Sequence, residues 1–199
     1  FILKYFCMKK YLLFLLFTAG TVHAQEWAKQ YDFVDDCVCG LAKVSKNGKF
    51  GYVNLQGALV VPLDYDEAFA FNEGLAAVRK EIKWGYRDST GKVMVEMKYE
   101  DAASFHDGMA AVKKNGKYGF INRDFDVVIP FEFSMAGRFF FFFAAVANSK
   151  NQWGYINLKG KIVIDYAYTF ADLFSESMAR VMKGSDMLYI DKSGKPIKE

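Results

Sequence analysis

The sequence has few of the residues that most often build catalytic and metal sites. Its 199 residues include two histidines and three cysteines, and one of the histidines, His23, lies in a predicted targeting segment. It contains no glycine-rich phosphate loop, no His-Glu-x-x-His and no paired Cys-x-x-Cys motif. A closed zinc site takes four ligands, and no distinctive serine or cysteine motif lies beside His106. These absences argue against an enzyme, and we expect no cofactor, no metal and no catalytic residue.

The longest apolar run near the N-terminus is too short to cross a membrane and has the form of a secretory signal. Residues 8–10, Met-Lys-Lys, precede an apolar stretch at 11–17, and the small-x-small triplet at 22–24 predicts cleavage after Ala24. A membrane span needs roughly 20 apolar residues. We therefore expect residues 1–24 to be an upstream extension plus a signal peptide. The mature protein is then periplasmic or extracellular and not membrane-spanning.

An excess of charge of one sign is also missing. The full chain holds 26 Lys and Arg residues against 23 Asp and Glu residues. Removal of residues 1–24 takes away three lysines and no acidic residue, which leaves 23 of each sign. A neutral domain with interspersed charges offers no electrostatic footprint to phosphate backbones, so nucleic acid is not an expected partner. Residues 25–199 are long enough for a single domain.

What the sequence has in abundance is internal repetition. An aromatic-Gly-aromatic motif has its glycine at positions 51, 85, 119 and 154, so consecutive glycines are 34, 34 and 35 residues apart. Met187-Leu188-Tyr189 is a degenerate fifth copy of the motif. A second landmark, Gly-Leu-Ala or a variant of it, keeps the same step. Such a period marks stacked repeats that share one core. The five units begin near Tyr31, Tyr65, Tyr99, Phe133 and Tyr168.

Local chemistry favours β-strands over helices in these repeats. Asn47-Gly48 and Asn115-Gly116 each separate two short β-type runs, and Asn-Gly is the strongest short hairpin signal. A compact connector, Tyr-acidic-x-Ala-x-x-Phe, leads into the next unit, and the density of turns leaves no room for two helices per period. We therefore predict an all-β fold, a tandem array of five three-stranded meanders. The array is solenoid-like or closes toward a barrel- or propeller-like form.

The central glycine of each motif has a predicted packing role. Trp84 and Tyr86 share one face of their strand, so Gly85 points to the other face. We expect an aromatic ring or the backbone of a neighbouring unit to approach closely there. Burial of three aromatic positions per unit does not offset the entropy of ordering a whole repeat. A lone unit is therefore expected to be unfolded, and the array is the folding entity.

At these landmarks the sequence resembles a known family. The string [Trp/Tyr/Phe]-Gly-[Tyr/Phe]-[Ile/Val]-Asn-x-x-Gly, followed by β-branched residues and the connector, looks like the bacterial WG (or KWG) β-repeat over about residues 31–197. The resemblance implies an all-β array of the kind found in exported proteins, with a binding role and no established activity. The sequence departs from the pattern at Asp124-Phe125, at Val34 and in the fifth copy, which lacks its aromatic-Gly.

Acidic pairs and the lone mature histidine could suggest a hydrolase. The pairs lie at residues 35–36, 66–67 and 100–101, and two carboxylates can serve as acid and base. The pairs recur in the connectors, however, where a capping or turn role explains them. His106 stands where the preceding unit has Asn72 and is expected on the surface.

Tryptophans and cysteines leave alternatives open. Trp27, Trp84 and Trp153 could stack on sugar rings if they are exposed, but the last two occupy repeat positions that other aromatic residues fill, which favours the core. Cys37 and Cys39 form a Cys-x-Cys pair. The pair could be free buried thiols, a strained or labile disulfide, or a site of intermolecular or metal chemistry.

One segment breaks the pattern. Residues 139–143 are all phenylalanine, and Phe140, Phe141 and Phe142 replace the polar turn residues and glycine of other copies. A contiguous exposed apolar patch would mark a contact with a partner or a membrane surface. A sequencing error in a homopolymer and local structural decay are the alternatives. We also expect Phe142 to adopt the backbone geometry of a glycine only with strain.

Together these observations predict a non-catalytic exported repeat scaffold that mediates protein or cell-surface interactions. Phe140, Phe141 and Phe142 are its possible partner-binding patch, and the partner is an unidentified protein or envelope polymer. The alternatives are a carbohydrate-binding module that uses exposed aromatic residues and an envelope hydrolase.

Overall fold

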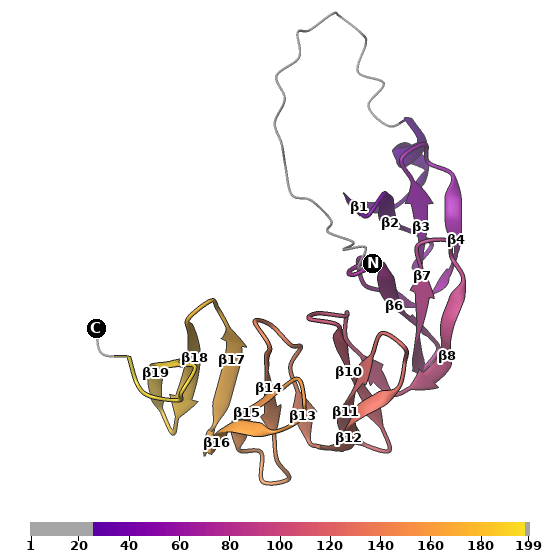
Figure 1. Ribbon diagram of the computed structural model, residues 1–199. Coiled ribbons are helices and arrows are strands. Elements are labelled where there is room, and N and C mark those ends of the chain that lie inside the picture. The colour runs from indigo at the N-terminus through magenta and orange to yellow at the C-terminus, as the bar shows by residue number, and fades with distance from the viewer. Residues whose placement is uncertain (1–25, 198–199) are drawn as a thin grey trace, which may run out of the picture.

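The computed structural model describes residues 26–197, and the predicted signal segment lies outside them. Within the described residues the chain is almost entirely β, with one short 3-10 helix, η1 (Glu26–Gln30), ahead of 19 strands. The strands form five antiparallel sheets, which we call blades 1 to 5 (Figure 1). In each blade the strands are hydrogen-bonded in chain order, so every blade is a simple meander. The prediction of an all-β array of five repeats is confirmed.

The strand bounds repeat from blade to blade. Blade 1 contains β1 (Phe33–Val38), β2 (Leu41–Lys46), β3 (Lys49–Asn54) and β4 (Leu59–Tyr65). Blade 2 contains β5 (Glu67–Ala68), β6 (Leu75–Lys80), β7 (Lys83–Asp88) and β8 (Val93–Tyr99). Blade 3 contains β9 (Asp101–Ala102), β10 (Met109–Lys114), β11 (Lys117–Asn122) and β12 (Val127–Phe133). Blade 4 contains β13 (Met135–Ala136), β14 (Phe143–Ala147), β15 (Trp153–Asn157) and β16 (Ile162–Tyr168). Blade 5 contains β17 (Phe170–Phe174), β18 (Met178–Lys183) and β19 (Asp186–Asp191).

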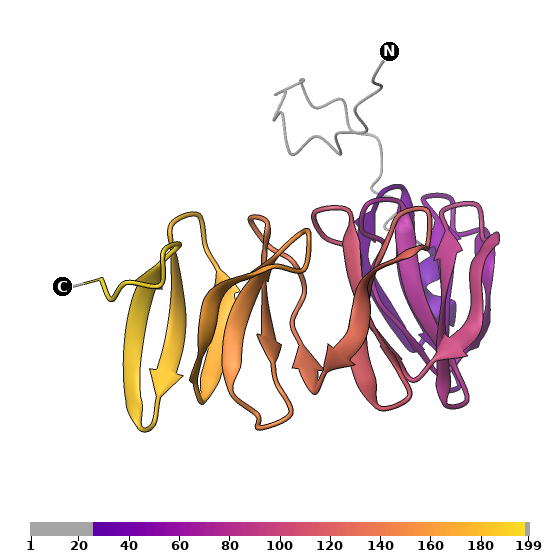
Figure 2. The same ribbon diagram turned by 60° about the horizontal axis from the view of Figure 1, so that its bottom comes forward.

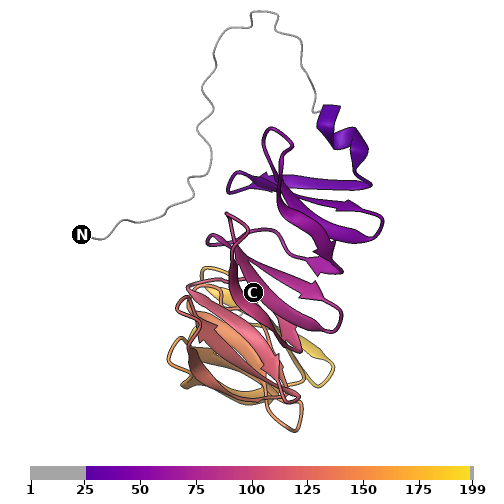
Figure 3. The ribbon, with the colours of Figure 1, turned by 90° about the vertical axis from the view of Figure 1, so that its right-hand side faces the viewer.

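The blades stack face to face along an open arc (Figures 1 and 3). The last strand of a blade, such as β4, β8 or β12, lies on the convex side, and the strands that follow each connector lie on the concave side. Figure 2 shows the sheets following one another in chain order to blade 5. Four-stranded sheets repeated in this way are the blades of β-propellers. In the described residues, blades 1 and 5 stand apart and the arc does not close.

Most blades have one strand more than the sequence predicts. The predicted meander has three strands, but blades 1 to 4 have four and only blade 5, as described, has three. The additional strand of blade 2 comes from the connector, where Glu67 and Ala68 pair with Arg79 and Val78 of β6. Connector residues pair in the same way in blades 3 and 4. Two residues are too few to show a strand pattern in a sequence, so only their pairing reveals them.

The acidic connector residues support the hairpin turns. The Asn47-Gly48 turn has the two positive φ angles, 52° and 73°, that its sequence predicts. The carboxylate of Asp32 accepts a hydrogen bond from the N–H of Asn47 at 2.7 Å. In blade 3 the carboxylate of Glu100 accepts from both turn residues at 2.8 and 2.9 Å, and the N–H of Gly116 is the main cause of its lowered pKa. Glu100, and Asp66 through the N–H of Glu81, therefore have the turn role predicted for the acidic pairs, whereas in blade 1 this role belongs to Asp32 and not to the predicted pair at 35–36.

The central glycine of each motif avoids a clash within its own blade. The strand pairing jumps from Trp84↔Tyr99 to Tyr86↔Val95, so β8 bulges toward Gly85. A Cβ at this glycine would lie 2.5 Å from the carbonyl oxygen of Val95. The equivalent distances in the other copies are 2.6, 2.7 and 2.6 Å, at Gly51, Gly119 and Gly154. The predicted close approach is therefore real, but it comes from the same blade and not from a neighbouring unit.

The blades are joined by a repeated aromatic contact. The Tyr52 hydroxyl of blade 1 donates to the carbonyl of Phe69 in blade 2 at 2.5 Å, and its ring packs edge-on against Phe71 at 4.7 Å. Tyr86 and Tyr155 make the same hydrogen bond to the next connector at 2.8 Å. Phe120 takes this position in blade 3 and packs on Phe139 at 4.9 Å without a hydroxyl. All four rings are fully buried, so the core lies between the blades rather than within any of them.

The bulge predicts a large effect of a single methyl group. We expect Gly85→Ala to lower the free energy of unfolding by about 3 kcal/mol or more, because its Cβ would meet a backbone carbonyl that cannot move without breaking the bulge. Gly137→Ala is the matched control, since the nearest atom to its Cβ lies at 3.5 Å. Chemical denaturation measures both. Equal stability of the two variants would contradict this role of the glycine.

The inter-blade contact predicts a reciprocal pair of changes. Tyr86→Phe leaves the buried Ala103 carbonyl without its donor and should destabilise the protein by about 1–2 kcal/mol. Phe120→Tyr places a hydroxyl where the other blades have one, opposite the equivalent carbonyl of Gly137, and should stabilise by about 1 kcal/mol. Thermal unfolding of both variants tests the pair. A loss of stability in Phe120→Tyr would show that blade 3 has no room for the hydroxyl.

Candidate interaction site on the inner turns

Each connector enters its blade through a tight turn on the concave side of the arc. In blade 2 the turn runs from Asn72 to Leu75, and the backbones of these two residues exchange hydrogen bonds at 2.9 and 3.0 Å. The two central residues, Glu73 and Gly74, have φ angles of 50° and 79°. Two consecutive positive φ angles are those of a type I′ turn, which favours Asn, Asp and Gly. We call the equivalent turns of blades 2, 3 and 4 the inner turns.

The inner turns are linked to one another by a ladder of hydrogen bonds. A carboxylate oxygen of Glu73 accepts from the N–H of Gly108 in the next turn at 3.2 Å. Asp107 repeats this step and accepts from the N–H of Phe142 at 2.8 Å. The third residue in this series is Phe141, which has no carboxylate and cannot continue the ladder to blade 5. The aromatic segment therefore replaces a polar link between blades.

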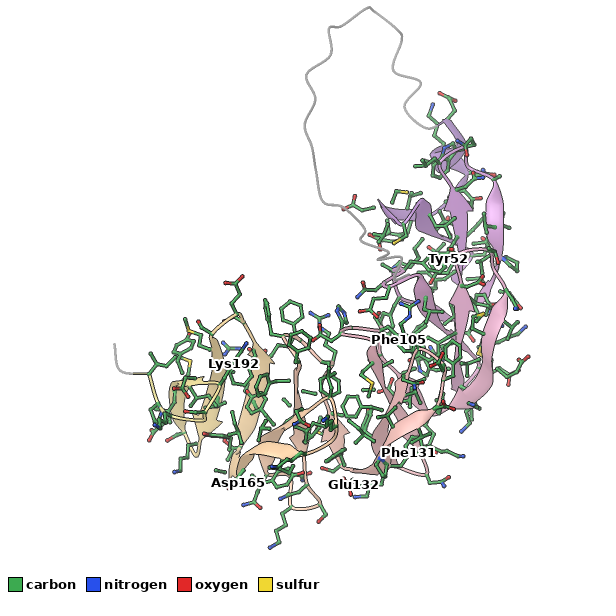
Figure 4. The ribbon with its side chains drawn as sticks, in the orientation of Figure 1. Tyr52, Phe105, Phe131, Glu132, Asp165 and Lys192 are labelled. Atoms are coloured by element: carbon green, nitrogen blue, oxygen red, sulfur yellow. The ribbon has the colours of Figure 1, made fainter. Side chains whose placement is uncertain are left out.

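Two inner turns are contacted by a cationic side chain of the following blade. Arg123 of blade 3 donates to the carbonyl of Glu73 and lies 3.6 Å from its carboxylate. Lys192 of blade 5 holds the equivalent place against Phe141, with its Nζ 5.6 Å from the ring centroid. Figure 4 shows Lys192 on the concave side of the arc. Blades 4 and 5 are thus joined by a cation–π contact between Lys192 and Phe141, at the place where an ion pair joins blades 2 and 3.

The three predicted patch residues lie together at this turn. Phe140 is 36% and Phe142 61% exposed, whereas Phe141 is half-buried between Phe140, 4.8 Å away, and Lys192. The Arg138 guanidinium lies 5.9 Å from the Phe140 ring centroid. The backbones of Phe141 and Phe142 have φ angles of 50° and 70°, so the predicted strain at Phe142 is present. We call Phe140, Phe141 and Phe142 the aromatic patch.

His106 lies in the row of inner turns, between Asn72 of blade 2 and Phe140 of blade 4. Its ring is half-buried, 3.1 Å from the side-chain nitrogen of Asn72 and 6.2 Å from the centroid of the Phe140 ring. Burial and then the charge of Arg138 lower its pKa below the ordinary value, which keeps the ring neutral at pH 7. His106 therefore lies at the surface, but it is only half exposed because it packs between the inner turns of blades 2 and 4.

The tryptophans and cysteines differ from some of their predicted roles. Trp84 is buried, as predicted, and Trp27 and Trp153 are half-buried, so the three form no exposed row for a sugar. Cys37 and Cys39 are both exposed and no disulfide joins them. The alternative of buried thiols is therefore wrong. Cys39 has a φ of 54°, and the following glycine φ is 82°, so the pair ends in a turn.

The sequence indicated the patch but not the cations over it. Lys192 lies more than 40 positions from the patch, and the only available signal is its place two periods after Arg123. Within residues 26–197 no cluster of three or more His, Cys, Asp or Glu side chains could hold a metal ion. No helix in that part of the chain is long and apolar enough to span a membrane.

A family model described as WG containing repeat matches five segments, residues 28–50, 50–84, 84–118, 118–140 and 153–185. These matches cover well over half of the sequence. The chain belongs to the WG repeat family. The gap between the last two matches begins at Phe141, within the aromatic patch, so this part of the WG repeat array departs most from the family pattern. No curated protein matches the sequence.

Two solved structures with low identity and TM-scores above 0.5 share the fold, and a third is similar at a lower score. Kluyveromyces lactis Hsv2p is 12% identical, with a TM-score of 0.53 over 83% of this chain and 62% of its own. A eukaryotic initiation factor is 7% identical, with a TM-score of 0.57 over 80% of this chain and 51% of its own. The WD40 β-propeller domain of Doa1 is 10% identical at a TM-score of 0.45, over 84% and 69%. The WG chain thus spans less than two thirds of the first two, and the likeness concerns fold alone.

Replacement of the aromatic patch should stabilise the protein. Phe140→Asn, Phe141→Glu and Phe142→Gly together copy the inner turn of blade 2 and remove a strained φ angle, which costs about 1–3 kcal/mol. The carboxylate introduced at position 141 would also face the blade 5 turn and Lys192. We expect a higher melting temperature and higher solubility. A clear fall in melting temperature would show that the phenylalanines are core residues.

Proposed function

We propose that this WG repeat protein is a non-catalytic, exported scaffold that binds a protein partner through the aromatic patch. The observation that carries the proposal is the exposed, strained Phe142. Blades 1, 2 and 3 hold glycine at this place, and a glycine would satisfy the turn at no steric cost. Backbone strain kept together with an exposed apolar side chain is more characteristic of a binding site than of a folding requirement.

The surroundings of the patch favour a particular kind of partner. The Phe140 ring lies beside Arg138, and the Phe141 ring lies beneath Lys192, so the aromatic patch carries two positive charges. A protein segment that combines an apolar side chain with nearby acidic residues would fit this arrangement. The hydrogen bond from Phe142 to Asp107 fixes the turn from which the ring projects. A prepared ring of this kind loses little freedom on binding.

The proposal of a scaffold also rests on what the carboxylates do. Asp32, Asp66 and Glu100 are occupied by N–H groups of hairpin turns. His106 is held among inner-turn residues, and the nearby carboxylates of Glu73 and Asp107 accept hydrogen bonds from N–H groups of the following turns. Export rests on the predicted signal in residues 1–24, and the expected N-terminus near Gln25 supports a place in the periplasm or outside the cell. The repeat fold then supplies the rigid surface on which the patch is displayed.

A binding experiment tests the proposed function. The purified protein is immobilised and exposed to an envelope extract of its source, in parallel with Phe142→Gly and with Ile82→Asn. Ile82 is 76% exposed and lies on a different turn, so its variant loses an exposed apolar side chain without touching the patch. We expect a partner that wild type and Ile82→Asn retain and that Phe142→Gly loses, followed by direct titration of that purified partner. The N-terminal mass of the same preparation checks cleavage before Gln25.

The outcomes separate the alternatives. Retention of the same partner by Phe142→Gly would remove the aromatic patch from the proposal. Retention of a polysaccharide that releases on sugar competition would favour the carbohydrate-binding alternative instead. Because Phe142→Gly is expected to be more stable than wild type, a loss of binding cannot be attributed to unfolding.

A further inference from the structure

Every junction between blades has a donor half and an acceptor half. The donor half is the face with Tyr52 or its equivalent, whose ring projects from one blade and carries a hydroxyl in every junction except that of Phe120. The acceptor half is the next connector, where Ala68, Phe71 and Ala76 surround the ring and the carbonyl of Phe69 accepts its hydroxyl. The two halves are complementary to each other and not to themselves. An unpaired donor face therefore needs an acceptor face to cover it.

Blade 5 presents an open donor half. Tyr189 lies opposite Arg180 as Tyr52 lies opposite Lys43, so it holds the place of the inter-blade tyrosine. It is 40% exposed, whereas its equivalents Tyr52, Tyr86 and Tyr155 are at 0%. Met178 and Met187 extend this apolar face and are 40% and 58% exposed. Among the described residues nothing lies against this face in the way that each blade lies against the one before it.

Blade 1 presents an open acceptor half. A cavity of about 120 Å³ on its outer face is lined by Val34, Asp35, Cys37 and Ala42, together with Trp27 of η1. One period later these four positions are Ala68, Phe69, Phe71 and Ala76, which form the socket for Tyr52. Cys37 is smaller than Phe71 and leaves the socket open. The cavity is thus the place that an inter-blade tyrosine from a preceding blade would fill.

The helix η1 takes the place of only one strand of that missing blade. We call the turn that follows the third strand of a blade, such as residues 88–91, the outer turn. In blades 2, 4 and 5 the glycine of this turn faces the last strand of the preceding blade, as Gly91 faces Val60 and Gly194 faces Ile164. In blade 1 the equivalent Gly57 faces Trp27, and an added Cβ would lie 2.2 Å from its ring. Trp27 therefore stands where a preceding fourth strand would stand. Within residues 26–197 no strand fills the three other positions beside blade 1, and blade 5 has three strands.

The charged residues on the donor face are compatible with such a junction. Arg180 pairs with Asp172 at 2.8 Å on blade 5, and Lys43 pairs with Asp35 at 3.0 Å on blade 1. The two pairs occupy equivalent positions, and blade 2 stacks on the face that carries the Lys43 pair. An ion pair at this place therefore does not prevent stacking.

We propose that two copies of this chain associate head to tail, with blade 5 of one stacked beside η1 on blade 1 of the other. Tyr189 enters the cavity of the partner's blade 1 and donates its hydroxyl to the carbonyl at position 35. Such a heterologous contact leaves one donor and one acceptor end free, so it continues into a ring or a filament. The open arc keeps the two ends of a single chain apart (Figure 1), which favours association over closure within one chain.

Sedimentation of the purified protein over a range of concentrations tests this contact, under reducing conditions so that the exposed cysteines do not crosslink. Wild type is expected to form dimers and larger species. Tyr189→Ala blocks the donor end and Cys37→Arg blocks the acceptor end, and each alone should be monomeric. Tyr189→Phe, which loses only the hydroxyl, should raise the dissociation constant about fivefold. Both altered residues are exposed, and far-UV circular dichroism checks that the variants fold.

A mixture of the two blocked variants gives the decisive result. Tyr189→Ala retains an acceptor end and Cys37→Arg retains a donor end, so an equimolar mixture should form a discrete dimer and nothing larger. Ile82→Arg, altered far from both ends, should associate as wild type does, and so should Phe142→Gly. A monomeric wild type, association that survives both blocking changes, or a mixture that stays monomeric would each overturn the proposal. Association lost in Phe142→Gly alone would assign self-contact to the aromatic patch instead.

Discussion

The structure depends on the contact in which an aromatic ring of one blade enters the connector of the next. A single blade of three or four short strands has two faces and cannot bury either of them by itself. The ring of Tyr86 is fully buried because blade 3 covers it, and its hydroxyl is satisfied because the Ala103 carbonyl faces it. Burial raises the pKa of this phenol far above its ordinary value, which keeps it a neutral donor. Phe120 shows that ring packing suffices where the hydroxyl is missing.

The turn that carries the aromatic patch follows from this contact between blades. For a connector to present its carbonyl and its phenylalanine to the preceding blade, the chain must pair with the next strand and then reverse within two residues. The reversal produces the inner turn with its two positive φ angles. In blade 4 the buried member of the run is Phe139, which packs under Phe120, while Phe140 and Phe142 project from the turn that follows. Burial and exposure thus alternate within one homopolymer because the turn, not the residue type, decides direction.

Comparison of the repeats was enough to find the aromatic patch, because a residue that differs from its counterparts one period away is visible without a structure. It was not enough to find Lys192 or Arg138, whose positions over the rings follow from how blades 4 and 5 stack. The role of Gly85 was assigned to the wrong neighbour for a related reason. A sequence shows that close approach is required, but a bulge in the next strand has no pattern by which its position can be read.

The sequence by itself determined the number of repeats, their β character and the hairpin turns at Asn47-Gly48 and Asn115-Gly116. These properties can be read from the sequence because they follow from the residues of each turn and from the constant spacing of the repeats. The tertiary structure alone decided that connectors become strands, that the arc formed by residues 26–197 is open, and that Tyr189 is exposed. Those properties are set by contacts between residues one or more periods apart, so the same position of the repeat is buried inside the stack and exposed at Tyr189.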